Sequence, residues 1–256
     1  PDHRAMYGAA VVIDAKCGDE NTGLVKDLVR NYFVRADGGN RGRDGNVHWG
    51  DLKRRLMPFM CSDMSVPQMV AIGFAEECAR REWPDLPEDK RPVGIVYFGD
   101  GAAQQGIVHE GMNWVAAANA AGRAAPMIFI INENNRACFT EPKEEYGLSD
   151  LVKRADGYGG MVGVDVFGFD PEAMFQETVC AVRRAQEMQS TLIVAHNFRL
   201  TGHNEDQIIR AKGAVERDDF FAVEEVFGLG ALGLVAFRDA VANEPVFGAW
   251  RATLLE

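Results

Sequence analysis

The hydrophobic positions of this chain fall into short apolar runs of strand length, separated by longer stretches in which apolar and polar residues recur at helical spacing. Four runs are typical of strands, at residues 93–98, 127–131, 162–167 and 191–198. Strands and helices alternate along the chain without an internal repeat or a hydrophilic linker. This order predicts one doubly wound α/β domain, with a mainly parallel sheet and helices on both faces.

The helices are predicted from their end signals and apolar stripes. Pro67 suits a first helical turn, and Asp170-Pro171 opens a helix that continues to about residue 189. A helix of about 18 residues is predicted after Gly101, because small and apolar side chains recur there at helical spacing. Asn21-Thr22 and Ser149 are caps for two shorter helices, and the glycine-rich segment 35–51 is a long loop. We interpret residues 1–256 as a single domain with a mostly helical extension from about residue 208.

Composition narrows the classes of protein that this fold can represent. The chain has 256 residues, 38 acidic and 27 basic side chains and a formal charge of −11, which disfavours nucleic acid and anionic membranes as partners. None of the five cysteines forms a CxxC pair, which favours a reducing compartment such as the cytoplasm. No apolar run reaches the roughly 18–20 residues that span a bilayer, so we expect a soluble protein.

The candidate chemistry lies where two predicted strands end. Gly99-Asp100-Gly101 follows the first strand, and Asn134-Asn135 follows the second. The carboxyl ends of parallel strands meet at the edge where open α/β sheets bind ligands. A carboxylate and an amide oxygen are hard ligands that suit Mg²⁺, and the glycines let a diphosphate approach the backbone. A magnesium and diphosphate site competes here with the plainer interpretation of two loop-closing turns.

The order of these motifs is similar to a known family. GDGAAQQG, followed by HEGMN, an apolar strand and ENNRACFT, resembles the thiamin-diphosphate site of the alpha subunit of 2-oxoacid dehydrogenases. The family pattern also places Gln, Gly, Glu and Asn in the intervening helix, here Gln105, Gly106, Glu110 and Asn113. The similarity extends to SVPQMVAIG and FRLTGHNEDQ and covers roughly residues 35–210. GDGAAQQG resembles the pyruvate and branched-chain type and GHNEDQ the 2-oxoglutarate type, so the substrate stays open.

The resemblance implies a role for each matching position. Asp100, Asn135 and the Ala137 carbonyl correspond to the Mg²⁺ ligands, with Asn134 as the alternative to Asn135 because an Ala-rich segment lengthens the interval before it. Further residues correspond to parts of the cofactor site, with Gly99, Gly101 and Ala102 at the diphosphate, Ser62 beside the aminopyrimidine, Arg199 and His203 at the phosphate end, and His48 and His203 as active-site histidines.

The resemblance implies a subunit of a thiamin-diphosphate enzyme that decarboxylates a 2-oxoacid oxidatively and passes the acyl group to a lipoyl-bearing acyltransferase. A beta-type partner supplies the glutamate that activates the cofactor, in an α2β2 assembly in the cytoplasm or, in a eukaryote, the mitochondrial matrix. The alternatives are an acetoin dehydrogenase, a split transketolase, or a non-catalytic scaffold subunit that retains the fold.

Other polar residues have simpler interpretations. His109-Glu110 is not a zinc motif, because HExxH requires a histidine where Asn113 stands. His196 lies within an apolar run, which favours a hydrogen-bonded core histidine over a catalytic one. Cys138 is interpreted as a packing residue, because no second thiol or base lies beside it.

Overall fold

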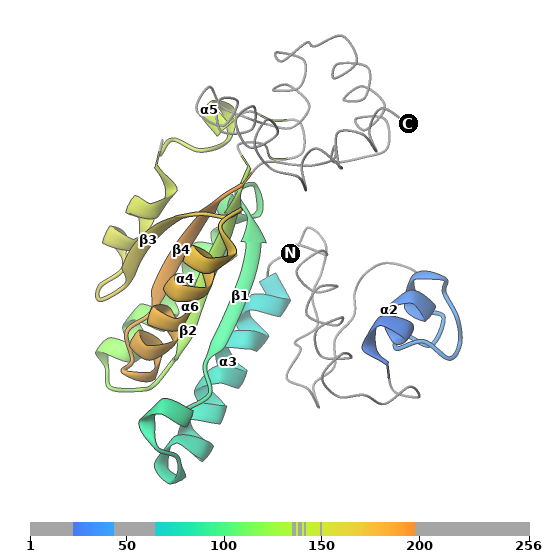
Figure 1. Ribbon diagram of the computed structural model, residues 1–256, viewed down its shortest axis with the longest axis horizontal. Helices are drawn as coiled ribbons and strands as arrows, with labels where there is room; N and C mark the ends of the chain where they lie inside the picture. Colours follow the sequence, from blue (N-terminus) through green and yellow to red (C-terminus); the bar gives the residue numbers. More distant parts are fainter. Residues whose placement is uncertain are drawn as a thin grey trace.

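The computed structural model of the chain describes residues 23–43, 65–134, 137, 140, 142–148 and 150–197. Within these residues lies a four-stranded parallel sheet with the strand order β1-β2-β4-β3 (Figure 1). Its strands are β1 (Gly94–Gly99), β2 (Met127–Glu133), β3 (Val162–Phe167) and β4 (Thr191–His196). The helices and 3₁₀ turns are α2 (Leu24–Tyr32), α3 (Ser65–Glu82), η2 (Trp83–Asp85), η3 (Glu88–Lys90), η4 (Ala102–Gln104), α4 (Gly106–Ala120), α5 (Pro142–Glu145), η5 (Leu151–Gly157) and α6 (Pro171–Gln186).

The two central strands are buried on both faces. Because side chains alternate along a strand, Phe129 and Ile131 of β2 point to one face of the sheet and Ile128 and Ile130 to the other. All four side chains are fully buried. Continuous apolar runs of this kind are typical of parallel strands covered on both sides.

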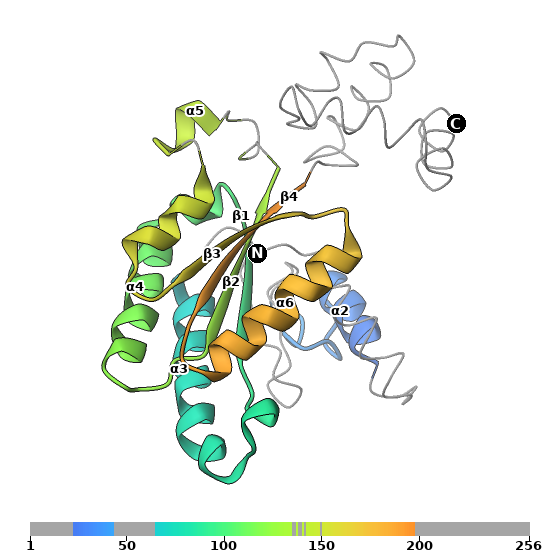
Figure 2. The ribbon, with the colours of Figure 1, turned by 60° about the vertical axis from the view of Figure 1, so that its left-hand side comes forward.

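Each face has its own hydrophobic core. Helices α3 and α4 and turn η5 cover one face, where the largest buried side chains are Ile72, Phe98, Met112, Met127, Phe129, Ile131, Leu151 and Leu192. Helix α6 covers the other face, with a core made of Ile128, Ile130, Val166, Ala181, Ala185, Ile193 and Ala195. Figure 2 shows α3 and α4 on one side of the sheet and α6 on the other.

The direction of the crossover connections explains this division. The chain moves across the sheet from β1 to β2 through α4, and onward to the far edge at β3 through η5. It then turns back through α6 to place β4 between β2 and β3. Because parallel crossovers are right-handed, reversing the direction of travel puts the connecting helix on the opposite face. The predicted doubly wound α/β fold is therefore confirmed.

Most predicted elements are confirmed, with differences at their ends. Strand β3 has the predicted bounds, and the Asp170 side chain caps α6 by accepting hydrogen bonds from the N–H groups of Glu172 (3.0 Å) and Ala173 (2.9 Å). The helix predicted after Gly101 is present as α4, but it begins later and is shorter, because turn η4 comes first and α4 runs over the 15 residues Gly106–Ala120. Helix α6 also ends at Gln186, before the predicted residue 189. None of the described helices combines the length and the apolarity needed to cross a bilayer.

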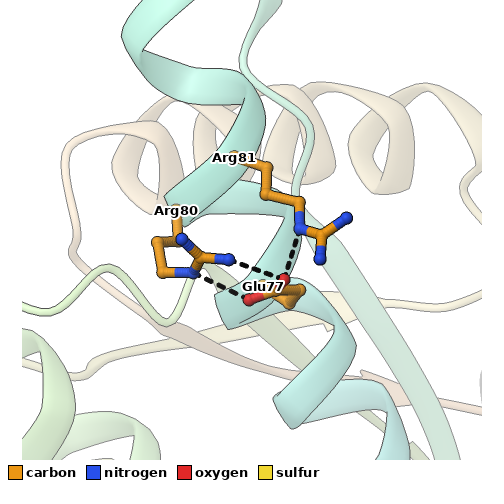
Figure 3. A network of polar contacts seen from close by, with 3 residues as sticks. All are labelled: Glu77, Arg80 and Arg81. Atoms are coloured by element: carbon orange, nitrogen blue, oxygen red, sulfur yellow. Dashed lines mark hydrogen bonds and ion pairs between the residues drawn. The ribbon is translucent and has the colours of Figure 1, made fainter.

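The outer face of α3 carries an exposed ion-pair network (Figure 3). Arg80 donates to both oxygens of Glu77 at 2.8 Å, and Arg81 Nε donates to Glu77 Oε1. The hydrogen bond from Arg80 is the main cause that lowers the pKa of Glu77 to about 2. Exposed pairs of this kind add little stability, so the position of α3 depends on its buried face.

The contact between α3 and α4 depends on the absence of a side chain at Gly111. The buried Gln68 donates from Nε2 to the carbonyl oxygens of Ile107 (3.3 Å) and Val108 (3.2 Å) of α4. A Cβ atom at Gly111 would lie 1.8 Å from Gln68 Nε2. A methyl group there must displace an amide that is held in place by two hydrogen bonds.

We therefore expect Gly111→Ala to lower the free energy of unfolding by roughly 1–3 kcal/mol, the usual cost of overpacking. The matched control is Gly73→Ala in α3, where no described atom lies within 4 Å of the added methyl group. That control should raise stability by about 0.5–1 kcal/mol, because alanine favours a helix interior over glycine. Urea unfolding of both variants checks this, and equal effects from the two would contradict it.

Candidate functional site at the carboxyl edge of the sheet

Polar groups that are far apart in the sequence meet at the carboxyl edge of the sheet. In the strand register Gly99 lies opposite Asn132, and His196 lies opposite both Glu133 and Phe167. The segments that follow β1 and β2 therefore leave the sheet side by side. This is the edge at which open α/β sheets bind ligands.

Asp100 is the most buried carboxylate at this edge, with 2% of its surface exposed. Its Oδ1 accepts a hydrogen bond from the Gly101 N–H at 3.1 Å, and its backbone N–H donates to the Asn132 carbonyl at 3.3 Å. Its own carbonyl accepts from Gln104 Nε2 at 2.9 Å. The backbone on both sides of this carboxylate is therefore held in one orientation.

Gly101 brings the segment after β2 against the turn after β1. A Cβ atom at Gly101 would lie 2.6 Å from the Ala137 Cβ and 3.0 Å from Glu145 Oε1. Only glycine permits this approach without a shift of the neighbouring chain. Ala137 itself pairs with Thr140, through hydrogen bonds of 3.1 Å from its N–H and 2.9 Å to its carbonyl oxygen.

Three buried polar atoms in the segment that follows β2 have no hydrogen-bond partner among the described residues: Asn134 Oδ1, Glu145 Oε2 and the Tyr146 hydroxyl. We refer to Asp100, Asn134, Glu145 and Tyr146 as the Asp100 cluster. Burial, followed by the charge of Asp100, raises the pKa of Glu145. Burial and the charges of Asp100, Glu133 and Glu145 likewise raise the pKa of Tyr146.

The cluster has the chemistry of a cation site. Oxygen atoms with unsatisfied lone pairs and an excess of negative charge favour a hard cation such as Mg²⁺. Among the described residues, no three His, Cys, Asp or Glu side chains form a metal-binding group. A cation here would need amide or carbonyl oxygens, which Asn134 and Ala137 supply at this edge.

A second group of polar residues, from η5 and α4, lies next to the turn after β1. Arg154, in η5, donates from Nη1 to the Ala103 carbonyl at 2.8 Å and from Nη2 to Gln104 Oε1. Next to it, His109 Nδ1 lies 2.7 Å from the Tyr158 hydroxyl. Burial and the nearby charge of Arg154 lower the pKa of His109.

The interpretation of His196 as a core histidine was wrong. Its side chain is 48% exposed at the end of β4, where Nδ1 lies 2.6 Å from Glu133 Oε2 and Nε2 lies 2.8 Å from Asp165 Oδ1. The hydrogen bond with Glu133 is the largest cause that raises the pKa of His196 to about 9. His196 is thus an imidazolium at neutral pH and links the carboxyl ends of three strands.

The structure brings some of the predicted site residues together and does not describe the others. Five lie in or beside the turn after β1: Gly99, Asp100, Gly101, Ala102 and Ala137. Another five, together with the segment from residue 208 onward, lie outside the described residues: His48, Ser62, Asn135, Arg199 and His203. Of the two alternative amides, Asn134 is therefore the one whose position is known.

Several residues at this edge were missed by the sequence analysis. Gln104 stands inside GDGAAQQG, yet the family pattern drew attention to Gln105 next to it. Arg154 lies in η5, and no local signal in the sequence connects it with a turn some fifty positions earlier in the chain. Glu145 belongs to no motif in the sequence, yet it is partly buried beside Gly101.

The fold and this edge define a doubly wound α/β protein whose strand ends present an oxygen-rich, negatively charged cluster beside a glycine turn. The dehydrogenase E1 component family matches residues 29–223 of the chain. The chain therefore belongs to the dehydrogenase E1 component family, as the resemblance implied.

Similar proteins carry related names. The chain is 33% identical over 184 residues to the 2-oxoisovalerate dehydrogenase subunit alpha of Bacillus subtilis. The matched region covers 71% of this chain and 51% of that protein. It is 30% identical over 206 residues to the mitochondrial 2-oxoisovalerate dehydrogenase subunit alpha of Homo sapiens, and the matched region covers 77% of this chain and 43% of that protein. It is 36% identical over 115 residues to the pyruvate dehydrogenase E1 component subunit alpha of B. subtilis, which covers 44% and 29%. The chain spans about half the length of the curated relatives it matches.

The raised pKa of His196 gives a testable dependence of stability on pH. A histidine whose pKa is raised on folding stabilises the protein fully below its unfolded pKa of about 6.5. This stabilisation is lost as the pH rises from there through about 9. We expect the stability difference between the parent and His196→Gln to be largest near pH 6 and to shrink toward pH 9.5.

Urea unfolding across this pH range measures the difference. His109→Gln is the matched control, because a lowered pKa makes protonation of His109 unfavourable to folding and gives a trend of opposite sign. A difference for His196→Gln that does not change with pH would contradict the role of the imidazolium.

Proposed function

We propose that the chain holds the magnesium and diphosphate half of a thiamin-diphosphate site, in an alpha-type subunit of a 2-oxoacid dehydrogenase. The observation that carries this proposal is the buried Asp100 carboxylate, which follows β1 at the sheet edge where Asn134, with its buried and unsatisfied Oδ1, follows β2. Ala137 packs against Gly101 beside it. Membership of the dehydrogenase E1 component family supports thiamin diphosphate as the cofactor.

The residues of this edge fit the proposed group by their chemistry. Asp100, the Ala137 carbonyl and Asn135, with Asn134 as its alternative, would be the Mg²⁺ ligands, because Mg²⁺ prefers a few protein oxygens together with phosphate oxygens and water. The backbone N–H groups of Gly101 and Ala102 would donate to the diphosphate at the start of η4, and the Gly101 N–H would then exchange its hydrogen bond to Asp100 Oδ1 for one to a phosphate oxygen. Burial, followed by the charge of Asp100, raises the pKa of Glu145, and bound Mg²⁺ would offset the part that comes from Asp100.

The remaining site residues belong to the same proposal. His203 and Arg199 would bind near the phosphate end of the cofactor, and the backbone around Ser62 would support its aminopyrimidine. Thiamin diphosphate supplies the electron sink for decarboxylation when it is bound. His48 and His203 would stabilise charge and move protons at the substrate and at the lipoyl group.

The proposed reaction is the oxidative decarboxylation of a 2-oxoacid with acyl transfer to a lipoyl-bearing acyltransferase. It requires a beta-type subunit that supplies the activating glutamate, within a heterotetramer in the cytoplasm or in the mitochondrial matrix of a eukaryote. The exposed side of α4 supports a contact outside this domain. Gly106, Glu110 and Asn113 of the family pattern all lie there, directed away from both hydrophobic cores.

Replacement of Asp100 tests the metal assignment. Removing an outer-shell partner of a metal ligand already costs about 10–100-fold in affinity, so Asp100→Ala should weaken Mg²⁺-dependent binding of thiamin diphosphate by at least about 100-fold. Isothermal titration of the full chain, with its beta-type subunit present, measures this. The matched control is Asp89→Asn, an exposed aspartate in η3 that precedes the sheet, and it should bind as the parent does. Equal affinity for Asp100→Ala and the parent would overturn the metal site.

Reconstitution tests the need for a partner. The chain alone should show no turnover of a 2-oxoacid, because the activating glutamate is proposed to belong to the beta-type subunit. Turnover should appear when that subunit is added, with pyruvate, branched-chain 2-oxoacids and 2-oxoglutarate tested in parallel. Turnover only with acetoin or with sugar phosphates would replace the proposed reaction. Absence of Mg²⁺-dependent thermal stabilisation by thiamin diphosphate would indicate a scaffold subunit.

A further inference from the structure

Arg154 is connected to Asp100 through two hydrogen bonds and one intervening side chain. Its guanidinium donates from Nη1 to the Ala103 carbonyl (2.8 Å) and from Nη2 to Gln104 Oε1. Gln104 in turn donates from Nε2 to the Asp100 carbonyl (2.9 Å). Turn η5 is thereby joined to the turn that presents Asp100, although neither Arg154 nor Gln104 takes part in the proposed cofactor contacts.

The donor and acceptor chemistry allows only one orientation of the Gln104 amide. A guanidinium has donors and no acceptor, so the group that faces Arg154 must be Oε1. The amide nitrogen then points toward Asp100, where it finds a carbonyl oxygen. Without Arg154 the amide could rotate by half a turn, which would put oxygen against oxygen at Asp100.

The orientation of Gln104 has a direct consequence at Asp100. Holding the Asp100 carbonyl also holds the peptide plane between Asp100 and Gly101, because the peptide group is planar. The N–H of that same plane donates to Asp100 Oδ1 at 3.1 Å. The peptide plane that Gln104 and Arg154 hold through its carbonyl therefore sets the direction of the carboxylate before the cofactor binds, and the direction in which the Gly101 N–H would meet the diphosphate.

Burying part of the Arg154 guanidinium costs free energy of solvation, which points to a role for this side chain beyond packing. The side chain is half-buried, and burial is the largest cause that lowers its pKa. Its two terminal nitrogens are directed at a carbonyl and an amide, both neutral acceptors. A partly desolvated cation with neutral acceptors contributes less stability than one paired with a carboxylate.

We propose that Arg154 is a positioning residue, which acts through Gln104 to hold Asp100 in the orientation that binds Mg²⁺ and diphosphate. This inference rests on the proposed function. The forked geometry of the guanidinium is essential, because two acceptors that lie apart must be held at once. An ammonium at the same place would keep the charge without the fork.

The experiment is a titration of the full chain and its beta-type subunit with thiamin diphosphate at saturating Mg²⁺. Arg154→Met should weaken binding by about 10–100-fold, as expected for an outer-shell partner of a metal ligand. At saturating cofactor its kcat should stay within about twofold of the parent, because the chemical step itself is not affected. Lys153→Ala is the matched control, a neighbouring exposed cation in η5 that pairs with Asp150 and should leave Kd unchanged.

Two further variants separate positioning from charge and from folding. Arg154→Lys should bind as weakly as Arg154→Met, and recovery of the parent Kd by lysine would overturn the inference in favour of charge alone. Gln104→Met, a neutral change of similar length, should reproduce the loss, and it keeps the test open if Arg154→Met does not fold. The double variant should be no weaker than either single variant, because both act through one path.

The results distinguish this inference from the function on which it rests. A parent assembly that binds no thiamin diphosphate would overturn the proposed function itself. A parent that binds, together with an Arg154→Met variant that binds equally well, would overturn the positioning role alone. A double variant whose fold-loss in affinity equals the product of the two single fold-losses would show that Arg154 does not act through Gln104.

Discussion

The parallel pairing of β2 with β4 is the constraint on which the rest of the structure depends. Both strands are buried on both faces, so each backbone polar group within them needs a partner in a neighbouring strand. Parallel neighbours cannot be joined by a tight hairpin, and every connection must cross a face of the sheet with a helix or a 3₁₀ turn. The two hydrophobic cores, the placement of α4 and α6 on opposite faces and the shared carboxyl edge all follow from this pairing.

The same constraint concentrates charge at one edge. Parallel strands end together, so the polar residues after β1 and β2 enter one small volume, and the glycine at 101 lets Ala137 and Glu145 approach closely. Burial, together with the nearby negative charges, then makes ionisation of further acidic groups unfavourable, as the raised pKa values of Glu145 and Tyr146 show. An edge of this kind gains stability when a cation binds, and this physical reason connects the fold with the proposed magnesium site.

The opposite charge enters the edge from elements that are remote in the sequence. His196 supplies an imidazolium between Glu133 and Asp165 at the ends of three strands. Arg154 reaches the turn after β1 from η5, across the face of the sheet that α4 also covers. Both cations donate hydrogen bonds that set the direction of neighbouring groups. Electrostatics and geometry are therefore coupled at this edge.

The sequence by itself determined the fold class, the four strands and the position of Asp100 at a strand end. These features depend on local periodicity and on turn chemistry, both of which are determined by residues that are consecutive in the sequence. The ends of helices depend on packing and are harder to predict from the sequence. Helix α4 starts later than predicted because turn η4 uses the same small and apolar residue types as a helix. His196 was misread because an apolar run does not show where the sheet stops covering its last residue. The links from Arg154 to Gln104 and from Ala137 to Gly101 were decided only by the tertiary structure. They join segments that the chain order separates and that the crossovers of a parallel sheet bring together.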